Sequence, residues 1–180
     1  MKKIILNLAA TLDGFIEGPN GEIDWCIMDD DMDFDAFIQS IDTIFYGRVS
    51  YDAWGNFQPE ENASPAEQLM WQGIHSKDKY VFSSQNRTDG KATFISSDIA
   101  STVAAIKKQG GKDIWLYGGA SLIKTFINLG LIDQYKISVH PIALGSGKPL
   151  FEDLREQVEL KLTGTRVFRS GVVELTYEPA

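Results

Sequence analysis

The stretch DIWLYGGASLIKTF, residues 113–126, joins an apolar run to a second apolar run through two adjacent glycines. The first run, Ile114–Tyr117, predicts a buried strand, and the second predicts a helix from about Ala120 to Leu129 that ends at Gly130. A glycine inside a rigid element costs roughly 0.5–1 kcal/mol. A glycine pair at this junction therefore indicates that the backbone must turn there or let another group approach closely.

Strands alternate with helices along the rest of the chain. Short runs rich in Ile, Val, Phe, Leu and Tyr predict strands at Ile4–Ala10, Thr43–Tyr46, Lys79–Phe82, Ala92–Ile95 and Tyr135–His140. A capping serine, a proline and a glutamate predict a helix from Ser64-Pro65 to about His75, and apolar spacing predicts another through Ile99, Val103 and Ile106. Val158–Thr165 and Val172–Tyr177 predict a closing antiparallel pair. This order predicts an α/β protein with a mostly parallel central sheet and an antiparallel C-terminal edge.

Composition limits the class of protein. A chain of 180 residues with 43% hydrophobic content predicts a single domain over residues 1–180. The net charge of -8 argues against nucleic acid as a partner, because most of the surface repels a polyanion. Cys26 is the single cysteine, so no internal disulfide can form, and we find neither a signal peptide nor an apolar stretch long enough for a membrane span. We therefore expect a cytoplasmic protein without membrane contact.

Groups suited to anion binding follow three predicted strands. After Gly118-Gly119, the backbone N–H groups of Ala120, Ser121 and Leu122 are free in the first helical turn, where phosphates bind. The same pattern, an apolar strand that ends in glycine and leads into a helix, recurs at Tyr46-Gly47-Arg48-Val49-Ser50-Tyr51. A third strand is followed by Ser83-Ser84. Ligands of parallel sheets bind at the carboxyl ends of strands. An ordinary tight turn at the glycine pair remains the alternative.

These segments resemble the dihydrofolate reductase superfamily over most of the chain. The residues that carry the resemblance, in the family's order and spacing, are Leu8–Ile16, Gly47-Arg48, Val81–Gln85 and Tyr117–Leu122. Within that superfamily, Thr11–Gly14, Pro141–Phe151 and Ser170–Tyr177 are similar to the reductase domain of bifunctional riboflavin-biosynthesis enzymes and to its small stand-alone relatives. The resemblance implies a three-layer fold with helices on both faces of the central sheet.

The resemblance also implies NADPH as the hydride donor. By that match, the backbone of Ala9 and Ile16 holds the nicotinamide amide, and Gly118 to Leu122 hold the pyrophosphate. The adenosine 2′-phosphate would meet Arg48, Ser83 and Ser84, with Gly47, Val49 and Ser50 in the same turn. None of these positions is acidic, which favours NADPH over NADH.

The acidic run Asp29–Asp35 contains the candidate catalytic carboxylate. Dihydrofolate reductases keep a carboxylate on a helix five residues after a tryptophan; counting from Trp25 selects Asp30, whereas counting back from Gly47-Arg48 selects Asp31. Such a group would hydrogen-bond the N–H edge of the substrate and assist proton delivery beside the hydride. The alternative is a solvated acidic face at a helix N-terminus. A calcium loop is excluded, because Phe34 stands where that loop needs glycine.

Three functional hypotheses remain open. The first is an NADPH-dependent reductase of a pterin-like or aminopyrimidine ring, resembling 5-amino-6-(5-phosphoribosylamino)uracil reductase, although the zinc deaminase domain of the bifunctional enzymes is missing from this chain. The second is dihydrofolate reductase itself, and the third is a non-catalytic NADPH-binding protein. No metal site is expected, since Cys26, His75 and His140 do not form a zinc-ligand pattern. The partners expected are a small heteroaromatic substrate and a second copy of the chain.

Overall fold

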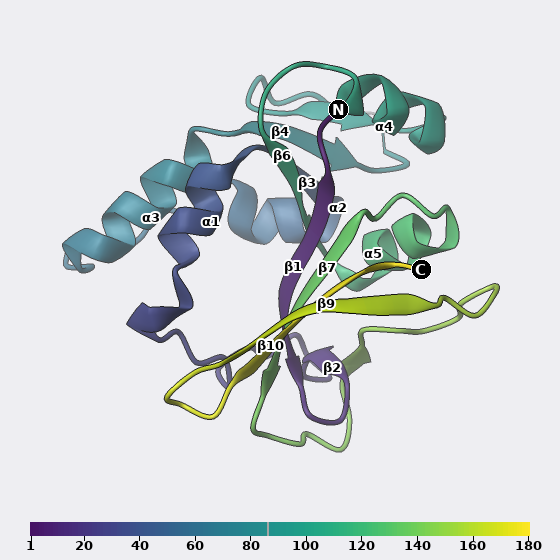
Figure 1. Cartoon of the computed structure of the whole chain (residues 1–180). Helices are drawn as coiled ribbons and strands as arrows, with labels where there is room; N and C mark the ends of the chain where they lie inside the picture. Colours follow the sequence, from purple (N-terminus) through teal and green to yellow (C-terminus); the bar gives the residue numbers. More distant parts are fainter. Residues whose placement is uncertain (86) are drawn as a thin grey trace. The chain divides into compact units, whose positions relative to one another are not determined.

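The computed structural model describes residues 1–85 and 87–180, with the side chain of Asp30 outside what is described (Figure 1). The chain forms two compact units. Unit 1 comprises Met1–Lys3 and Asp33–Gly119, and unit 2 comprises Ile4–Met32 and Ala120–Ala180. The single domain over residues 1–180 stays a prediction.

The parallel strands of unit 1 pair in the order β5-β4-β3-β6, and β3, β4 and β6 are labelled in Figure 1. The strands are β3 (Ile41–Gly47), β4 (Asp78–Phe82), β5 (Thr93–Ile95) and β6 (Asp113–Gly118). The helices are α1 (Phe34–Ser40), α2 (Arg48–Ser50), the π-helical turn η2 (Tyr51–Gly55), α3 (Pro65–His75) and α4 (Ile99–Lys107). The predicted strands and helices of this part of the chain are confirmed to within a few residues.

Local sequence explains the helices of unit 1. The Ser64 hydroxyl accepts a hydrogen bond from the Glu67 N–H at 3.2 Å, and Pro65 occupies the first turn of α3, as the capping pattern predicts. Val103 and Ile106 are the buried residues of α4. Strand β3 is buried almost throughout, which is typical of a central parallel strand covered on both faces.

Unit 2 carries the antiparallel edge. Its larger sheet has the order β1-β7-β10-β9, in which β1 and β7 are parallel and the other pairs are antiparallel. These strands are β1 (Ile4–Thr11), β7 (Gln134–His140), β9 (Leu160–Val167) and β10 (Val173–Pro179). The helix α5 (Ala120–Asn128), the 3-10 turn η1 (Asp30–Met32) and the short pair β2 (Phe15–Glu17) and β8 (Lys148–Pro149) complete the unit. The α/β class and the antiparallel C-terminal edge are confirmed.

Two features of unit 2 escaped the sequence analysis. Strands β2 and β8 have only three and two residues, which is too short for an alternating pattern. The closing strands also run two residues further than predicted at their C-terminal ends, to Val167 and Pro179.

No helix among the described residues is long and apolar enough to cross a membrane.

Candidate functional site

Three strand ends that carry the predicted anion-binding groups lie side by side in unit 1. Strands β3 and β6 pair with Tyr46 opposite Gly118, and β3 and β4 pair with Gly47 opposite Phe82. Because the strands are parallel, the residues that follow each strand emerge at the same edge of the sheet. The structure therefore brings Gly119, Arg48 and Ser83 to neighbouring positions, as the sequence predicts.

The Gly118-Gly119 turn has a backbone conformation and surroundings that favour small residues. Gly118 has φ +105°, in the region that L residues rarely adopt, and its peptide bond to Gly119 is cis. A Cβ on Gly119 would lie 3.0 Å from the Ser50 hydroxyl oxygen on α2, closer than an ordinary contact. The conformation of Gly118 therefore favours glycine, and a side chain on Gly119 would press on the Ser50 hydroxyl of α2.

The structure pairs Arg48 with a nearby carboxylate, that of Asp52. Arg48 Nη1 donates to Asp52 Oδ2 at 3.0 Å, one helical turn further along the chain. Arg87 Nη1 donates to the other oxygen of the same carboxylate, Asp52 Oδ1. The hydrogen bond from Arg87 is the main reason why the pKa of Asp52 lies below its usual value. Two guanidinium groups from different segments therefore share one carboxylate.

Arg87 is the residue of this site that the sequence analysis missed. It follows the predicted Ser83-Ser84 pair by a few positions, and that order along the chain is the only signal that could have pointed to it. Ser83 Oγ accepts from the Gln85 N–H at 3.0 Å, so the segment after β4 turns at once. Ser84 and Val49 are exposed, and Ser50 is half-exposed.

The other predicted cofactor residues belong to unit 2. Ala9 lies on β1, Ile16 lies on β2, and Ala120, Ser121 and Leu122 form the first turn of α5. Leu122 is buried, whereas Ser121 is exposed. Their contact with a cofactor stays a prediction.

The segment around Trp25 is tied to the end of β7 within unit 2. The Trp25 ring meets the His140 ring edge-on, with 5.3 Å between the centroids. His140 is 2% exposed, and its ring nitrogens lie 2.9 Å from the Ser138 carbonyl oxygen and 3.3 Å from that of Ile27. These contacts are typical of a structural histidine, which fixes the segment that leads into the acidic run.

The acidic run continues from this segment into contacts with β9 and the turn after it. Asp29 Oδ2 accepts from the Ser170 N–H at 3.3 Å, and Arg166 Nη2 donates to the Asp31 carbonyl oxygen at 2.9 Å. Asp31 Oδ1 is buried and has no hydrogen-bond partner within the described part of the chain. A buried carboxylate oxygen without a partner is costly, so a hydrogen-bond donor from water or a ligand would stabilise Asp31.

The run does not form the helix that was expected to carry the catalytic carboxylate. Asp30 and Asp31 lie on the 3-10 turn η1, and the α-helix starts only at Phe34, after Asp33 adopts φ 51°. The left-handed conformation of Asp33 interrupts the helix, because asparagine and aspartate tolerate this conformation better than most residues. The carboxylate prediction for Asp30 lies outside the described side chains.

A second turn in unit 2 is organised by Asp13. Its carboxylate accepts from the Thr11 hydroxyl at 2.6 Å and from the backbone N–H groups of Gly145 and Leu144 at 2.7 and 3.2 Å. The Thr11 hydrogen bond, followed by that of Gly145, lowers the pKa of Asp13. The Thr11–Gly14 turn thereby holds the loop that follows Pro141.

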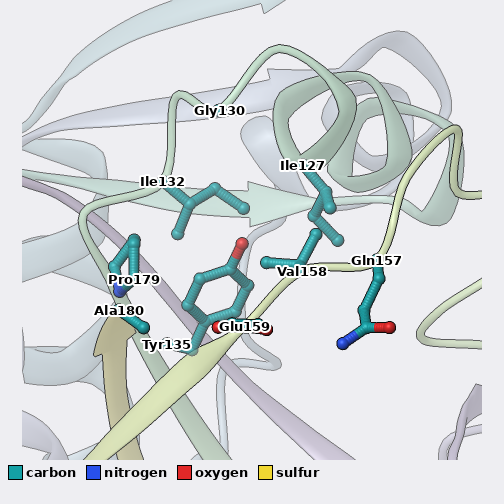
Figure 2. Close-up of a pocket in the computed structure, with 9 residues that line it drawn as sticks. All are labelled: Ile127, Gly130, Ile132, Tyr135, Gln157, Val158, Glu159, Pro179 and Ala180. Atoms are coloured by element: carbon teal, nitrogen blue, oxygen red, sulfur yellow. The ribbon is translucent and has the colours of Figure 1, made fainter.

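A cavity of about 500 Å³ lies at another place in unit 2, and Figure 2 shows the residues that line it. Its lining consists of Ile127, Gly130, Ile132, Tyr135, Gln157, Val158, Glu159, Pro179 and Ala180. Tyr135 is the second residue of β7, so this cavity lies at the amino end of that strand. Ligands of parallel α/β sheets bind at the carboxyl ends of the strands. This cavity is therefore not the first candidate for the active site.

The parallel strands with anion-binding groups at their carboxyl ends and the antiparallel C-terminal edge define a dihydrofolate-reductase-like fold. A dihydrofolate reductase from Enterococcus faecalis, whose structure is a complex with NADP(H), has a TM-score of 0.66 at 15% identity, over 98% of this chain and 96% of that one. A protein of Shewanella sp. PV-4, provisionally named as a riboflavin biosynthesis protein, has a TM-score of 0.80 at 23% identity, over 100% of this chain and 99% of that one.

Within that fold, the family is the one described as RibD C-terminal domain, and this chain belongs to it. The family model matches residues 2–174. The uncharacterized protein YyaP of Bacillus subtilis (strain 168) is 56% identical over 177 residues, which cover 98% of this chain and 94% of YyaP. Membership of this family identifies a reductase-type domain related to riboflavin biosynthesis.

Proposed function

We propose that this protein is an NADPH-dependent reductase of an aminopyrimidine or pterin-like substrate, of the type that acts in riboflavin biosynthesis. The observation that carries the proposal is the side-by-side position of Gly119, Arg48 and Ser83 at the carboxyl edge of three parallel strands. Family membership supports reductase chemistry, and the NADP(H) complex of the Enterococcus faecalis relative supports the class of cofactor.

The groups present in unit 1 fit a dinucleotide phosphate. The glycine turn, which a single Cβ would fill, permits close approach of a pyrophosphate to the main chain. Arg48 and Arg87 supply guanidinium groups for charge-assisted hydrogen bonds to a 2′-phosphate, and Ser83 and Ser84 supply hydroxyl groups near them. When bound, the reduced nicotinamide supplies a hydride.

The substrate would be held in unit 2 by Asp31. The unpaired oxygen Oδ1 can accept a hydrogen bond from an N–H group of an aminopyrimidine or pterin ring. Reduction of a C=N bond needs a hydride on carbon and a proton on nitrogen, and Asp31 would stabilise the protonated nitrogen edge. Trp25, held by His140, offers a flat apolar surface in the same segment.

The test is turnover with defined substrates. Purified protein is incubated with NADPH and either 5-amino-6-(5-phosphoribosylamino)uracil or dihydrofolate, and loss of the reduced-nicotinamide absorbance is followed. We expect turnover with the aminopyrimidine and slower or no turnover with dihydrofolate. Turnover with dihydrofolate alone would identify a dihydrofolate reductase. NADPH binding without turnover on either substrate would identify a non-catalytic binding protein.

A further inference from the structure

Asp52 lies between two arginines that belong to different segments of unit 1. Its Oδ2 accepts from Arg48 on α2, at 3.0 Å, and its Oδ1 accepts from Arg87 on the segment after β4. A carboxylate and a phosphate both present a pair of anionic oxygens to guanidinium groups, in a similar bidentate geometry. The carboxylate thus occupies the kind of position that a phosphate group takes between two arginines.

Arg87 has further contacts besides those with Asp52. Its guanidinium carbon lies 5.5 Å from the Phe94 ring centroid and 6.0 Å from that of Tyr51, at the distance of cation–π contacts. Its Nη2 also lies 3.7 Å from Asp89 Oδ2, an oxygen that accepts from the Tyr51 hydroxyl at 2.8 Å. Two rings and a second carboxylate therefore contact Arg87 in addition to Asp52.

The Asp52 contacts are weak enough to be exchanged. The side chains of Arg48, Asp52 and Arg87 are 40%, 36% and 40% exposed. Ion pairs at such exposure contribute little to stability, because water and salt screen them. A phosphate dianion brings more charge and more acceptor oxygens than a carboxylate, so it competes favourably for both arginines.

We propose that Asp52 sets the cofactor preference by occupying, in the free protein, the place between Arg48 and Arg87 that the adenosine 2′-phosphate takes. The inference rests on the proposed NADPH function. Binding of NADPH separates Asp52 from both arginines, and the loss of these two ion pairs offsets part of the binding free energy. NADH lacks the 2′-phosphate and leaves the two ion pairs intact. The carboxylate thereby lowers the affinity for NADPH without changing that for NADH.

A carboxylate at this place also permits the opposite role. Asp52 could accept hydrogen bonds from the free ribose hydroxyl of NADH, as acidic residues do in many NAD-binding proteins. In that case the carboxylate would stay in place and favour NADH. The two roles predict opposite effects of its removal, which makes Asp52→Asn the decisive variant.

The experiment measures dissociation constants of wild type and Asp52→Asn for NADPH, NADH, adenosine 2′,5′-bisphosphate and adenosine 5′-monophosphate at one ionic strength. The two adenosine nucleotides probe the phosphate position without the nicotinamide. We expect Asp52→Asn to bind NADPH and the bisphosphate about three- to tenfold more tightly, as the loss of two exposed ion pairs implies. The affinities for NADH and the monophosphate should change by less than about twofold.

Asp89→Asn is the matched control. It removes the same charge from the same neighbourhood, while its amide oxygen can still accept from Tyr51. Since Asp89 does not bridge the arginines, we expect at most about a twofold change in NADPH affinity. An equal gain in both variants would reveal a general charge effect and overturn the proposal. Thermal unfolding of both variants checks that they are folded.

The remaining outcomes separate this inference from the proposed function. Weaker NADH binding by Asp52→Asn, without a gain in NADPH affinity, would assign the ribose-binding role to Asp52 and overturn the proposal. An unchanged or weaker affinity for NADPH would also overturn it. If the wild-type protein binds neither NADPH nor the bisphosphate, the proposed function fails and this inference with it. A crystal structure with the bisphosphate should show the phosphate on Arg48 and Arg87, with Asp52 turned away from both.

Discussion

Replacement of Gly119 by alanine separates a role in folding from a role in cofactor binding. The added Cβ would lie 3.0 Å from Ser50 Oγ, so the hydroxyl must give way by a few tenths of an ångström. The backbone at Gly119 is outside the positive-φ region, so alanine is tolerated there. Moving the serine to a poorer rotamer costs about 0.5–1.5 kcal/mol. In a chain of 180 residues, that lowers Tm by roughly 1–6 °C.

The effect on binding should be larger than the effect on stability. The methyl group would stand where the main chain is expected to meet the pyrophosphate, so we expect NADPH affinity to fall at least about tenfold, or about 1.4 kcal/mol. Titration of tryptophan fluorescence with NADPH measures the affinity, and thermal unfolding measures the stability. Gly119→Val should abolish binding while the protein stays folded.

Two further variants make the reasoning refutable. Ser50→Ala combined with Gly119→Ala removes the hydroxyl that the methyl group meets, so the lost stability should return while the lost NADPH affinity should not. Gly118→Ala, at φ +105°, should cost about 1–3 kcal/mol through backbone strain alone. If Gly119→Ala binds NADPH like the wild type, or if the double variant regains the affinity, the turn is only structural.

Other variants test the remaining parts of the site. Arg48→Ala should weaken NADPH binding about tenfold and leave NADH almost unchanged, because a partly exposed charge-assisted bond is lost; a parallel fall of both affinities would refute the phosphate role. Asp31→Asn should reduce turnover at least about tenfold without lowering Tm, because the buried oxygen has no described partner to lose; normal turnover would remove Asp31 from the mechanism. The pKa of Asp13 is depressed in the folded protein, so its stabilising effect is present above the ordinary value of 3.8 and lost as the pH falls through the lowered value. The Tm difference between wild type and Asp13→Asn should therefore be full at neutral pH and shrink below about pH 4, and a constant difference down to about pH 3 would contradict this assignment.

The parallel strands could be predicted because their signals are local. Strand β3 reads as an apolar run bounded by Gly47, and Ser64-Pro65 with Glu67 marks the start of α3 within four residues. The neighbouring positions of Gly119, Arg48 and Ser83 then follow from parallel pairing, which places all carboxyl ends at one edge. A general rule of topology was sufficient there, without knowledge of any side-chain contact.

The acidic run shows where local signals fail. Seven residues with five aspartates suggest a helix N-terminus, yet the chain forms a 3-10 turn, then a left-handed residue at Asp33, and only then α1. The turn at Asp31 is held by Arg166, which is 135 positions away in the sequence. Spacing from Trp25 or from Gly47 cannot include such a contact.

The joint contact of Arg48 and Arg87 with Asp52 could not be predicted from local sequence either, because Arg87 belongs to a distant segment. The pair Arg48 and Asp52 is visible in the sequence, because residues four apart meet on a helix. That pair alone suggests that the arginine is already satisfied and has no further role. The contact from Arg87, 35 positions away, changes the interpretation, because one carboxylate shared by two arginines leaves both with spare donors. A phosphate supplies more acceptors than Asp52 does, so the ion pair does not exclude a phosphate role for Arg48. It is the contact that a phosphate would replace.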